Sequence, residues 1–216
     1  MSQHTLTLLR FTYKKLKEKL TVSDSKKLFH EQFPYVIPGL YKKIVDEMLV
    51  ELNLLNHQSE FEQDYLFCIG LTETFKELTQ GYEPEKHLDI LFESICSSTN
   101  FVAKEIKETS QRFQEEFKDK SSKDLLKVLK EKSDAKLYPS RILNLGMYIL
   151  ISKSNDLKEK DESEINKVIS DIFEKLNLSS NKAEKDIGIY KSTLSKMKQA
   201  KELIVELRIK DKKKGK

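Results

Sequence analysis

Tryptophan is absent from this chain of 216 residues, and glycine, proline and cysteine are scarce. Six glycines and four prolines allow few tight turns, and 34% of the residues are charged, a composition typical of helical proteins. No run of alternating polar and apolar residues lies between turn signals, so we expect no β-strands. The two cysteines, Cys68 and Cys96, lack a CxxC spacing, and we expect them to be buried, reduced thiols.

Long apolar runs are missing as well. No uninterrupted run is longer than that at residues 147–151, whereas a membrane-spanning helix needs about 20 apolar residues. An apolar signal-peptide core followed by a small-residue cleavage site is also lacking. We therefore expect neither a membrane span nor a cleaved signal peptide.

Recognisable catalytic motifs are not found. The four histidines, His4, His30, His57 and His87, have no ExxH or HxxxH partner, so a zinc or di-iron site is not expected. There is no glycine-rich phosphate loop and no nucleophile motif. We therefore expect a non-enzyme without a cofactor, a metal ion or a small-molecule substrate.

The net charge of +4 is concentrated at the two ends of the chain. Residues 1–20 carry five cations against Glu18, and residues 210–216 carry five lysines against Asp211. Each end therefore has a net charge of +4, which leaves −4 for the body between them. A nucleic-acid-binding protein would instead concentrate positive charge on a folded face. The basic ends suggest solvated tails or contacts with an anionic membrane surface, with the candidate contacts Lys14, Lys15, Lys212, Lys213 and Lys214.

A strongly apolar helix is expected over residues 38–57. On a wheel of about 100° per residue, one half is filled by Leu40, Tyr41, Ile44, Val45, Met48, Leu49, Leu52 and Leu55. Val50 and Leu54 extend this surface, and the polar wedge contains only Lys42, Asp46 and Asn53. Because a surface helix has a wider polar face, we expect other helices to surround this one almost completely. The expected fold is all-α, a single multi-helix domain around this central helix.

Two acids of the same helix, Glu47 and Glu51, lie one turn apart at an apolar seam, where an unpaired carboxylate is costly. Among the four arginines, only Arg141 lies in a segment apolar enough to be buried. We predict that Arg141 pairs with Glu47 or Glu51 and ties this helix to the one at residues 139–151. Arg141→Ala should then be destabilising, whereas Lys153→Ala at the exposed end of that helix should cost little.

The body is expected to span residues 21–178, followed by a long helix with a basic tail at residues 179–216. Thr21 and Asp24 have the spacing of a capping box. Gly81, followed by Tyr82, has the pattern of a Schellman motif that ends a helix near residue 79.

Residues 1–20 form a basic leader with an apolar stripe at helical spacing, made by Leu6, Leu9, Tyr13, Leu16 and Leu20. One interpretation is an amphipathic helix that lies on an anionic membrane. The other is a leader that frays or docks loosely on the body.

Two segments of the chain have similar sequences, which suggests an internal repeat. The pattern FxIGL at residues 67–71 resembles LxLGM at residues 143–147, and each is followed by a helix with a Phe-Glu pair, at Phe92 and Phe173. The offset drifts from 76 to 81 residues between these matches. A duplicated three-helix unit is therefore a hypothesis only.

Five separate blocks, in order and spacing, resemble the thylakoid formation protein family, the photosystem II repair-associated family of cyanobacteria and plastids. They are TVSD at residues 21–24, LYKKIVDEMLVELxLL at 40–55, GYxPE at 81–85, YxSR at 138–141 with Gly146, and YxSxLxKM at 190–197. The resemblance covers about residues 21–210, and the leader falls outside it.

The resemblance implies an all-helical, non-catalytic protein that associates peripherally with the cytoplasmic face of the thylakoid membrane. Its implied partner is the FtsH-type membrane protease that removes photodamaged photosystem II subunits. The protein would stabilise this protease. The candidate partner surface comprises Thr21, Asp24, Lys42, Lys43, Gly81, Tyr82 and Glu85. Two alternatives remain: a peripheral membrane scaffold without a protease client, and a small-molecule-binding helical enzyme, which would need a pocket with convergent titratable groups.

Overall fold

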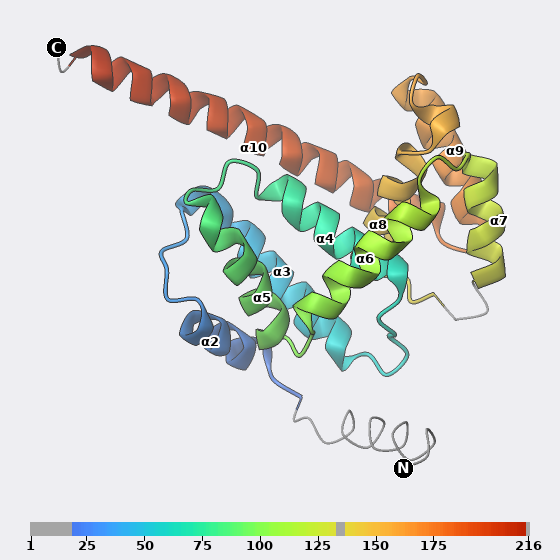
Figure 1. Cartoon of the computed structure of the whole chain (residues 1–216), viewed down its shortest axis with the longest axis horizontal. Coiled ribbons are helices and arrows are strands. Elements are labelled where there is room, and N and C mark those ends of the chain that lie inside the picture. Colours follow the sequence, from blue (N-terminus) through green and yellow to red (C-terminus); the bar gives the residue numbers. More distant parts are fainter. Residues whose placement is uncertain (1–18, 133–136, 215–216) are drawn as a thin grey trace.

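The computed structural model describes residues 19–132 and 137–214 of the chain (Figure 1). Within these ranges the fold is all-helical, as the composition predicts, with nine α-helices, two short 3-10 helices and no strand. In chain order the elements are α2 (Val22–Gln32), α3 (Gly39–His57), α4 (Tyr65–Leu78), η1 (Glu85–His87), α5 (Leu88–Ser98), α6 (Ala103–Phe117), α7 (Ser122–Lys132), α8 (Arg141–Ser152), η2 (Asn155–Leu157), α9 (Glu162–Lys175) and α10 (Ser180–Lys214).

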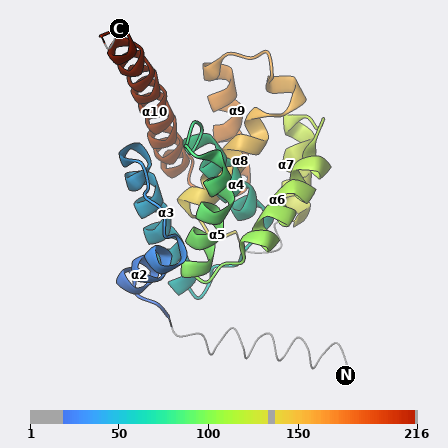
Figure 2. The ribbon, with the colours of Figure 1, turned by 60° about the vertical axis from the view of Figure 1, so that its left-hand side comes forward.

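Helices α4 and α8 form the centre of the molecule and make the most extensive contact between any two elements described. Both are apolar around most of their circumference, which is typical of helices enclosed by others. Helix α6 packs on α4 and α10 packs on α8, while α2, α3 and α5 gather at one end (Figures 1 and 2). The C-terminal part of α10 extends beyond the other helices (Figure 1).

Two glycines allow α4 and α8 to approach each other closely. A Cβ atom on Gly70 would lie 2.0 Å from the carbonyl oxygen of Ile142, and one on Gly146 would lie 2.0 Å from that of Leu66. These are backbone atoms, which cannot move aside as a side chain can. Each glycine therefore lies against the carbonyl four residues before the other glycine, a local two-fold relation between the helices.

The same element order occurs twice, as α4-η1-α5-α6 and as α8-η2-α9-α10. Asp64 and Ser140 cap the first helix of each unit, six residues before its glycine. The second and third helices are joined through Asn100 and Asn177, which have φ angles of 65° and 56°. The hydrogen bonds around the two asparagines also match, since Phe101 N donates to Cys96 O and Leu178 N donates to Phe173 O.

This correspondence corrects the sequence alignment of the two units. Cys96 occupies the place of Phe173, at an offset of 77 residues, so the match of Phe92 with Phe173 is wrong. The offset is 76 residues at the glycines and 77 at the asparagines. The larger offset of 81 residues belongs to the two Phe-Glu pairs, which are not equivalent in the structure, whereas the turns that follow them are.

Helix α3 has the expected bounds, but other helices do not surround it as completely as predicted. The apolar half-wheel is buried, with Leu49 and Leu52 at 1% and 0% exposure. Leu54, in contrast, is 53% exposed. Asn53, assigned to the polar wedge, is buried because its Nδ2 donates to Leu20 O and to Ser25 Oγ, each at 2.8 Å.

Candidate partner-binding surface

The predicted partner residues lie in two places. Thr21 is the N-cap of α2, and Asp24 lies in its first turn. This end of α2 lies beside the C-terminal half of α3, since Asn53 of α3 donates a hydrogen bond to the carbonyl of the neighbouring Leu20. The other residues lie near the start of α3, about 18 Å away along its axis. The structure therefore does not gather the seven residues into one patch.

Thr21 and Asp24 form the capping box that their spacing predicts. Asp24 N donates to Thr21 Oγ1 at 3.2 Å, and Thr21 N donates to Asp24 Oδ2 at 3.0 Å. The hydrogen bonds from Thr21 hold the pKa of Asp24 below its ordinary value. Their polar groups are thus engaged in starting α2.

The turn after α4 meets the start of α3 and a distant part of α10. Tyr41 of α3 lies 5.0 Å from Tyr82 between ring centroids, and its hydroxyl donates to Gln80 O at 3.1 Å. Lys201 Nζ of α10 donates to the same carbonyl at 3.1 Å. Sequence reasoning treated Tyr41 as a core residue only and missed Lys201, whose partner is a backbone atom that no sequence pattern marks.

The Schellman prediction at Gly81 is wrong in register. Helix α4 ends at Leu78 with Thr79 as its C-cap, because the hydroxyl of Thr79 bonds back to Phe75 O at 2.7 Å. Gly81 does adopt a left-handed φ of 77°, but it does so inside a turn closed by Tyr82 N and Thr79 O at 3.0 Å. Glycine is favoured at such a position because it has no Cβ.

A hollow of about 660 Å³ lies beside this turn. The half-buried Leu88 contributes apolar surface above the buried rings of Tyr82 and Phe92, and Glu85 is exposed at its margin. Lys107 lies over the ring of Phe92 and pairs with Asp89 at 2.8 Å. Three of the predicted partner residues, Gly81, Tyr82 and Glu85, thus line one recess, whereas Lys42 and Lys43 are exposed on the first turns of α3.

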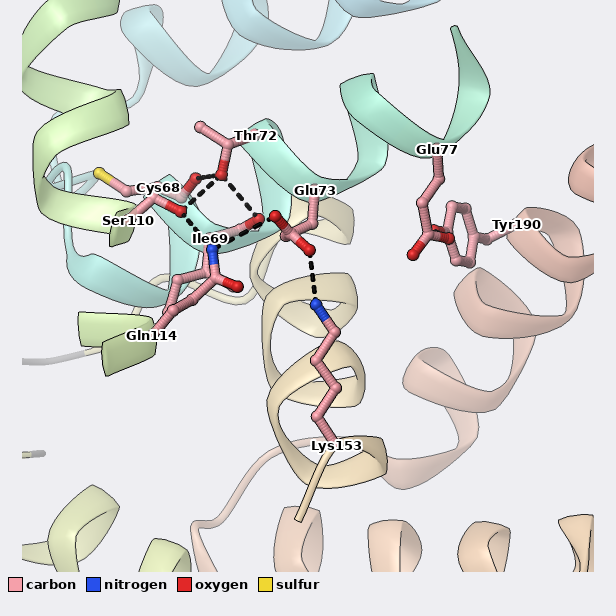
Figure 3. A network of polar contacts seen from close by, with 9 residues as sticks. All are labelled: Cys68, Ile69, Thr72, Glu73, Glu77, Ser110, Gln114, Lys153 and Tyr190. Atoms are coloured by element: carbon pink, nitrogen blue, oxygen red, sulfur yellow. Dashed lines mark hydrogen bonds and ion pairs between the residues drawn. The ribbon is translucent and has the colours of Figure 1, made fainter. Parts of the chain in front are cut away.

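A polar network holds α4, α6 and α8 together (Figure 3). Thr72 and Ser110 share a hydrogen bond of 2.6 Å between their hydroxyls, and Gln114 donates to Ser110 at 3.0 Å and to Glu73 at 3.3 Å. Lys153 Nζ lies 2.5 Å from Glu73 Oε2, although the Glu73 side chain is only 12% exposed. Burial alone would raise the pKa of Glu73, but the Lys153 ammonium and the Gln114 hydrogen bond bring it below its ordinary value.

Two contacts fix the N-terminal half of α10. The hydroxyl of Tyr190 bonds Glu77 of α4 (Figure 3), and Asn144 of α8 donates to Asp186 at 2.8 Å. Burial, together with the Glu77 carboxylate, raises the pKa of Tyr190. Residues 180–201 are in this way tied to both central helices, and the helix then continues past the body.

The structure brings Arg141 together with Glu51 and Glu47. Arg141 Nε donates to Glu51 Oε2 at 2.7 Å, and its NH1 lies 3.9 Å from Glu47 Oε2. The Arg141 side chain is 33% exposed, Glu51 18% and Glu47 47%. Burial nevertheless outweighs the attraction of Arg141 and raises the pKa of Glu51.

The two cysteines are free and buried, as predicted, and burial raises the pKa of each thiol to about 12. Among the described residues, no cluster of histidine, cysteine and acidic side chains is arranged to hold a metal ion. None of the helices in the described ranges has the length and apolar character needed to cross a bilayer. Of the candidate membrane contacts, Lys14 and Lys15 lie outside the described residues, and Lys212, Lys213 and Lys214 are described only as part of the α10 backbone.

Comparison with known proteins gives consistent matches along the chain. The family model of the thylakoid formation protein matches residues 21–216. Thf1 of Prochlorococcus marinus strain MIT 9312 is 80% identical over 92% of this chain and 99% of its own length. Thf1 of Parasynechococcus marenigrum strain WH8102 is 37% identical over 91% and 92%. A solved structure of Psb29 at 1.55 Å has a TM-score of 0.79 over 90% of this chain and 98% of that one, at 24% identity.

Proposed function

Because the chain belongs to the thylakoid formation protein family, we propose that it is a non-catalytic factor of thylakoid biogenesis and photosystem II repair. It associates with an FtsH-type membrane protease and keeps that complex abundant at the cytoplasmic face of the thylakoid membrane. The observation that carries this proposal is the family match over residues 21–216, which includes every helix from α2 to α10.

The recess beside the turn at Gly81 supports a protein partner. It combines apolar surface from the half-buried Leu88 with charged groups of both signs at its margin, which is the composition of a partner-binding surface rather than of a closed substrate pocket. Lys42 and Lys43 are exposed on the neighbouring end of α3.

Deletion of the gene tests this function. The deletion strain should recover photosystem II activity more slowly after strong light and should contain less FtsH-type protease. Affinity purification of the tagged protein from thylakoid extract should recover the protease. Normal recovery with normal protease abundance would show that the proposal is wrong.

Membrane association is proposed to depend on the basic tail. Each lysine near an anionic surface contributes roughly 1 kcal/mol, an effect screened over about 10 Å at 0.1 M salt. Changing lysines 212–214 to glutamine should therefore weaken binding to anionic liposomes at low salt. A triple glutamine variant at the exposed Lys123, Lys127 and Lys175 changes the net charge equally and should bind as the wild type does. Equal binding of all three proteins would mean that the tail does not contact lipid.

A further inference from the structure

The loop between α2 and α3 holds apolar side chains in solvent. Val36 at its tip is 88% exposed and Tyr35 is 42% exposed, although Phe33 and Ile37 on either side of them are buried. The loop is anchored, because these two neighbours are buried and the Tyr35 ring stacks on His87 at 3.9 Å between centroids. Apolar side chains grouped in this way at a surface mark an interaction site.

A hollow of about 400 Å³ lies beside this loop, between α2 and α3. Val36 contributes exposed apolar surface above the buried Ile37, and Lys42 and Asp46 of α3 complete one wall. Asp46 is already paired with Lys26 at 2.8 Å. Lys42 is exposed and makes no ion pair or hydrogen bond with another described residue. This hollow, which we call the α2–α3 pocket, therefore combines apolar surface with an unpaired lysine.

The projecting part of α10 carries the complementary groups. Leu203 and Val205 are 57% and 54% exposed, and Glu202 and Glu206 are also exposed. At about 100° per residue, the two acids lie on one side of the helix, between the two apolar side chains. Neither acid has a partner among the described residues. We refer to residues 202–206 as the acidic segment.

The pocket and the acidic segment start from one junction. Tyr41 Oη of α3 and Lys201 Nζ of α10 each donate to Gln80 O at 3.1 Å. Lys42 follows Tyr41 in the chain, and Glu202 follows Lys201. The start of α3 and the free end of α10 accordingly lie on the same side of the molecule (Figure 1). Complementary groups that are neighbours on one molecule form the self-complementary surface that a two-fold dimer requires.

We propose that two copies of the chain form a two-fold dimer, in which the acidic segment of each copy packs into the α2–α3 pocket of the other. Glu202 and Glu206 then lie against Lys42, and Leu203 packs beside Val36. Each contact occurs twice in such a dimer. A second copy is favoured over an anionic lipid surface, because that surface would repel the two acids. The dimer is a property of the chain alone and does not depend on the protease proposed above.

Sedimentation of the full-length protein tests this dimer. The wild type should show a reversible monomer–dimer equilibrium as its concentration rises. Lys42→Glu should raise the dissociation constant by more than about tenfold, because it places like charges together at both contacts. Lys175→Glu is the matched control, since it makes the same change of charge at an exposed residue of α9. It should leave the equilibrium unchanged.

Charge reversal on both sides distinguishes a specific contact from a folding defect. Changing Glu202 and Glu206 to lysine should weaken the dimer as Lys42→Glu does. Combining all three substitutions should restore it, because the attraction is then re-established with the signs exchanged. Weak dimers in all of these variants, without recovery in the combined one, would overturn the proposed pairing.

Cross-linking tests which surfaces meet. Val36→Cys and Leu203→Cys each add an accessible thiol, whereas the native Cys68 and Cys96 are 0% exposed. With a short bismaleimide, a mixture of the two variants should give more covalent dimer than either variant alone. Equal yields in the three samples would contradict the contact between Val36 and Leu203.

Two further results would overturn the dimer itself. One is a wild type that sediments as a monomer at every concentration. The other is a monomer that binds anionic vesicles and loses this binding on Val36→Asp, which would assign the loop to lipid.

Discussion

Gly70 and Gly146 face each other where α4 crosses α8, and each lies against the backbone carbonyl four residues before the other. The crossing has no room for a side chain on either helix. The two caps, Asp64 and Ser140, stand at the same distance before their glycines, so corresponding parts of the two helical units meet at the centre of the fold.

Alanine at either glycine should therefore be strongly destabilising. A new Cβ would lie 2.0 Å from a carbonyl oxygen, and relief requires the helices to separate, at a cost of about 3 kcal/mol or more. Gly188→Ala is the control, because a Cβ at this position of α10 would have no atom within 4 Å. It should stabilise the protein by about 1 kcal/mol, since alanine is the better helix former. Urea unfolding of the three variants measures both effects, and equal destabilisation of all three would contradict this account of the crossing.

The similarity between the two glycine-containing segments is visible in the sequence, but their contact is not. Similar residues at similar spacing indicate related local structure, whereas the contact between Gly70 and Gly146 depends on how the chain returns after more than 70 residues. Likewise, the equivalence of Asn100 and Asn177 is visible only from their positive φ angles. The preceding residues, Cys96 and Phe173, differ too much in size to be aligned by side-chain type.

The Arg141 pair should contribute to stability, but less than a fully buried pair. Removing one partner of a fully buried ion pair costs about 3–5 kcal/mol. Because Arg141 is 33% exposed and Glu51 18% exposed, water can partly replace the guanidinium, so we expect about 2 kcal/mol for Arg141→Ala. Comparison with Glu51→Gln and with the double variant isolates the interaction. Strictly additive losses would show that the two groups do not stabilise each other.

The structure changes the expectation for Lys153. Its ammonium pairs with Glu73, which is only 12% exposed, so Lys153→Ala leaves a largely buried carboxylate whose remaining hydrogen bond within the described residues comes from Gln114. We now expect a loss of about 1 kcal/mol. Lys158→Ala is a suitable control, because among the described residues the Lys158 ammonium bonds Asn155 alone, in an exposed contact. Thermal unfolding that shows equal midpoints for the two variants would support the sequence-based expectation of little cost.

These two ion pairs show what sequence can predict about this surface. Arg141 could be assigned because the chain has few arginines and only one lies in an apolar segment. Glu73 could not be assigned, because 39 cations compete for 35 acids and helical periodicity does not indicate which of them meet. The hollow beside Gly81 was similarly hidden, since Tyr41 and Lys201 meet at the Gln80 carbonyl from distant parts of the chain.

Glu51 and Glu73 should have opposite effects on the pH dependence of stability. The pKa of Glu51 lies above its ordinary 4.5 in the folded state, so its stabilising contribution is present below the unfolded pKa and is lost as the pH rises through the folded pKa. The pKa of Glu73 lies below 4.5, so its contribution is present above the unfolded pKa and is lost as the pH falls through the folded pKa.

Urea unfolding at about pH 4 and about pH 7 separates these two contributions. Relative to the wild type, Glu51→Gln should gain stability as the pH rises, whereas Glu73→Gln should lose it. Glu174→Gln, at an exposed residue of α9, controls for the general loss of a carboxyl group. The same direction of change for the Glu51 and Glu73 variants would contradict the opposite pKa shifts.

Two tyrosines near α4 should respond differently to loss of the hydroxyl. Tyr190 is 5% exposed, and its hydroxyl bonds Glu77, so Tyr190→Phe removes a charge-assisted hydrogen bond worth about 1.5–3 kcal/mol. Tyr82 is 2% exposed, and its hydroxyl has no hydrogen-bond partner among the described residues. Tyr82→Phe should therefore leave stability unchanged or increase it by about 1 kcal/mol, because a buried unpaired hydroxyl is unfavourable. Both substitutions remove the same atom from a buried ring, so each is the control for the other. Hydrogen exchange should also become faster in residues 186–197 of the Tyr190 variant only, since the contact between Tyr190 and Glu77 ties α10 to α4. Equal unfolding free energies for the two variants would show that the Glu77 hydrogen bond does not stabilise the fold.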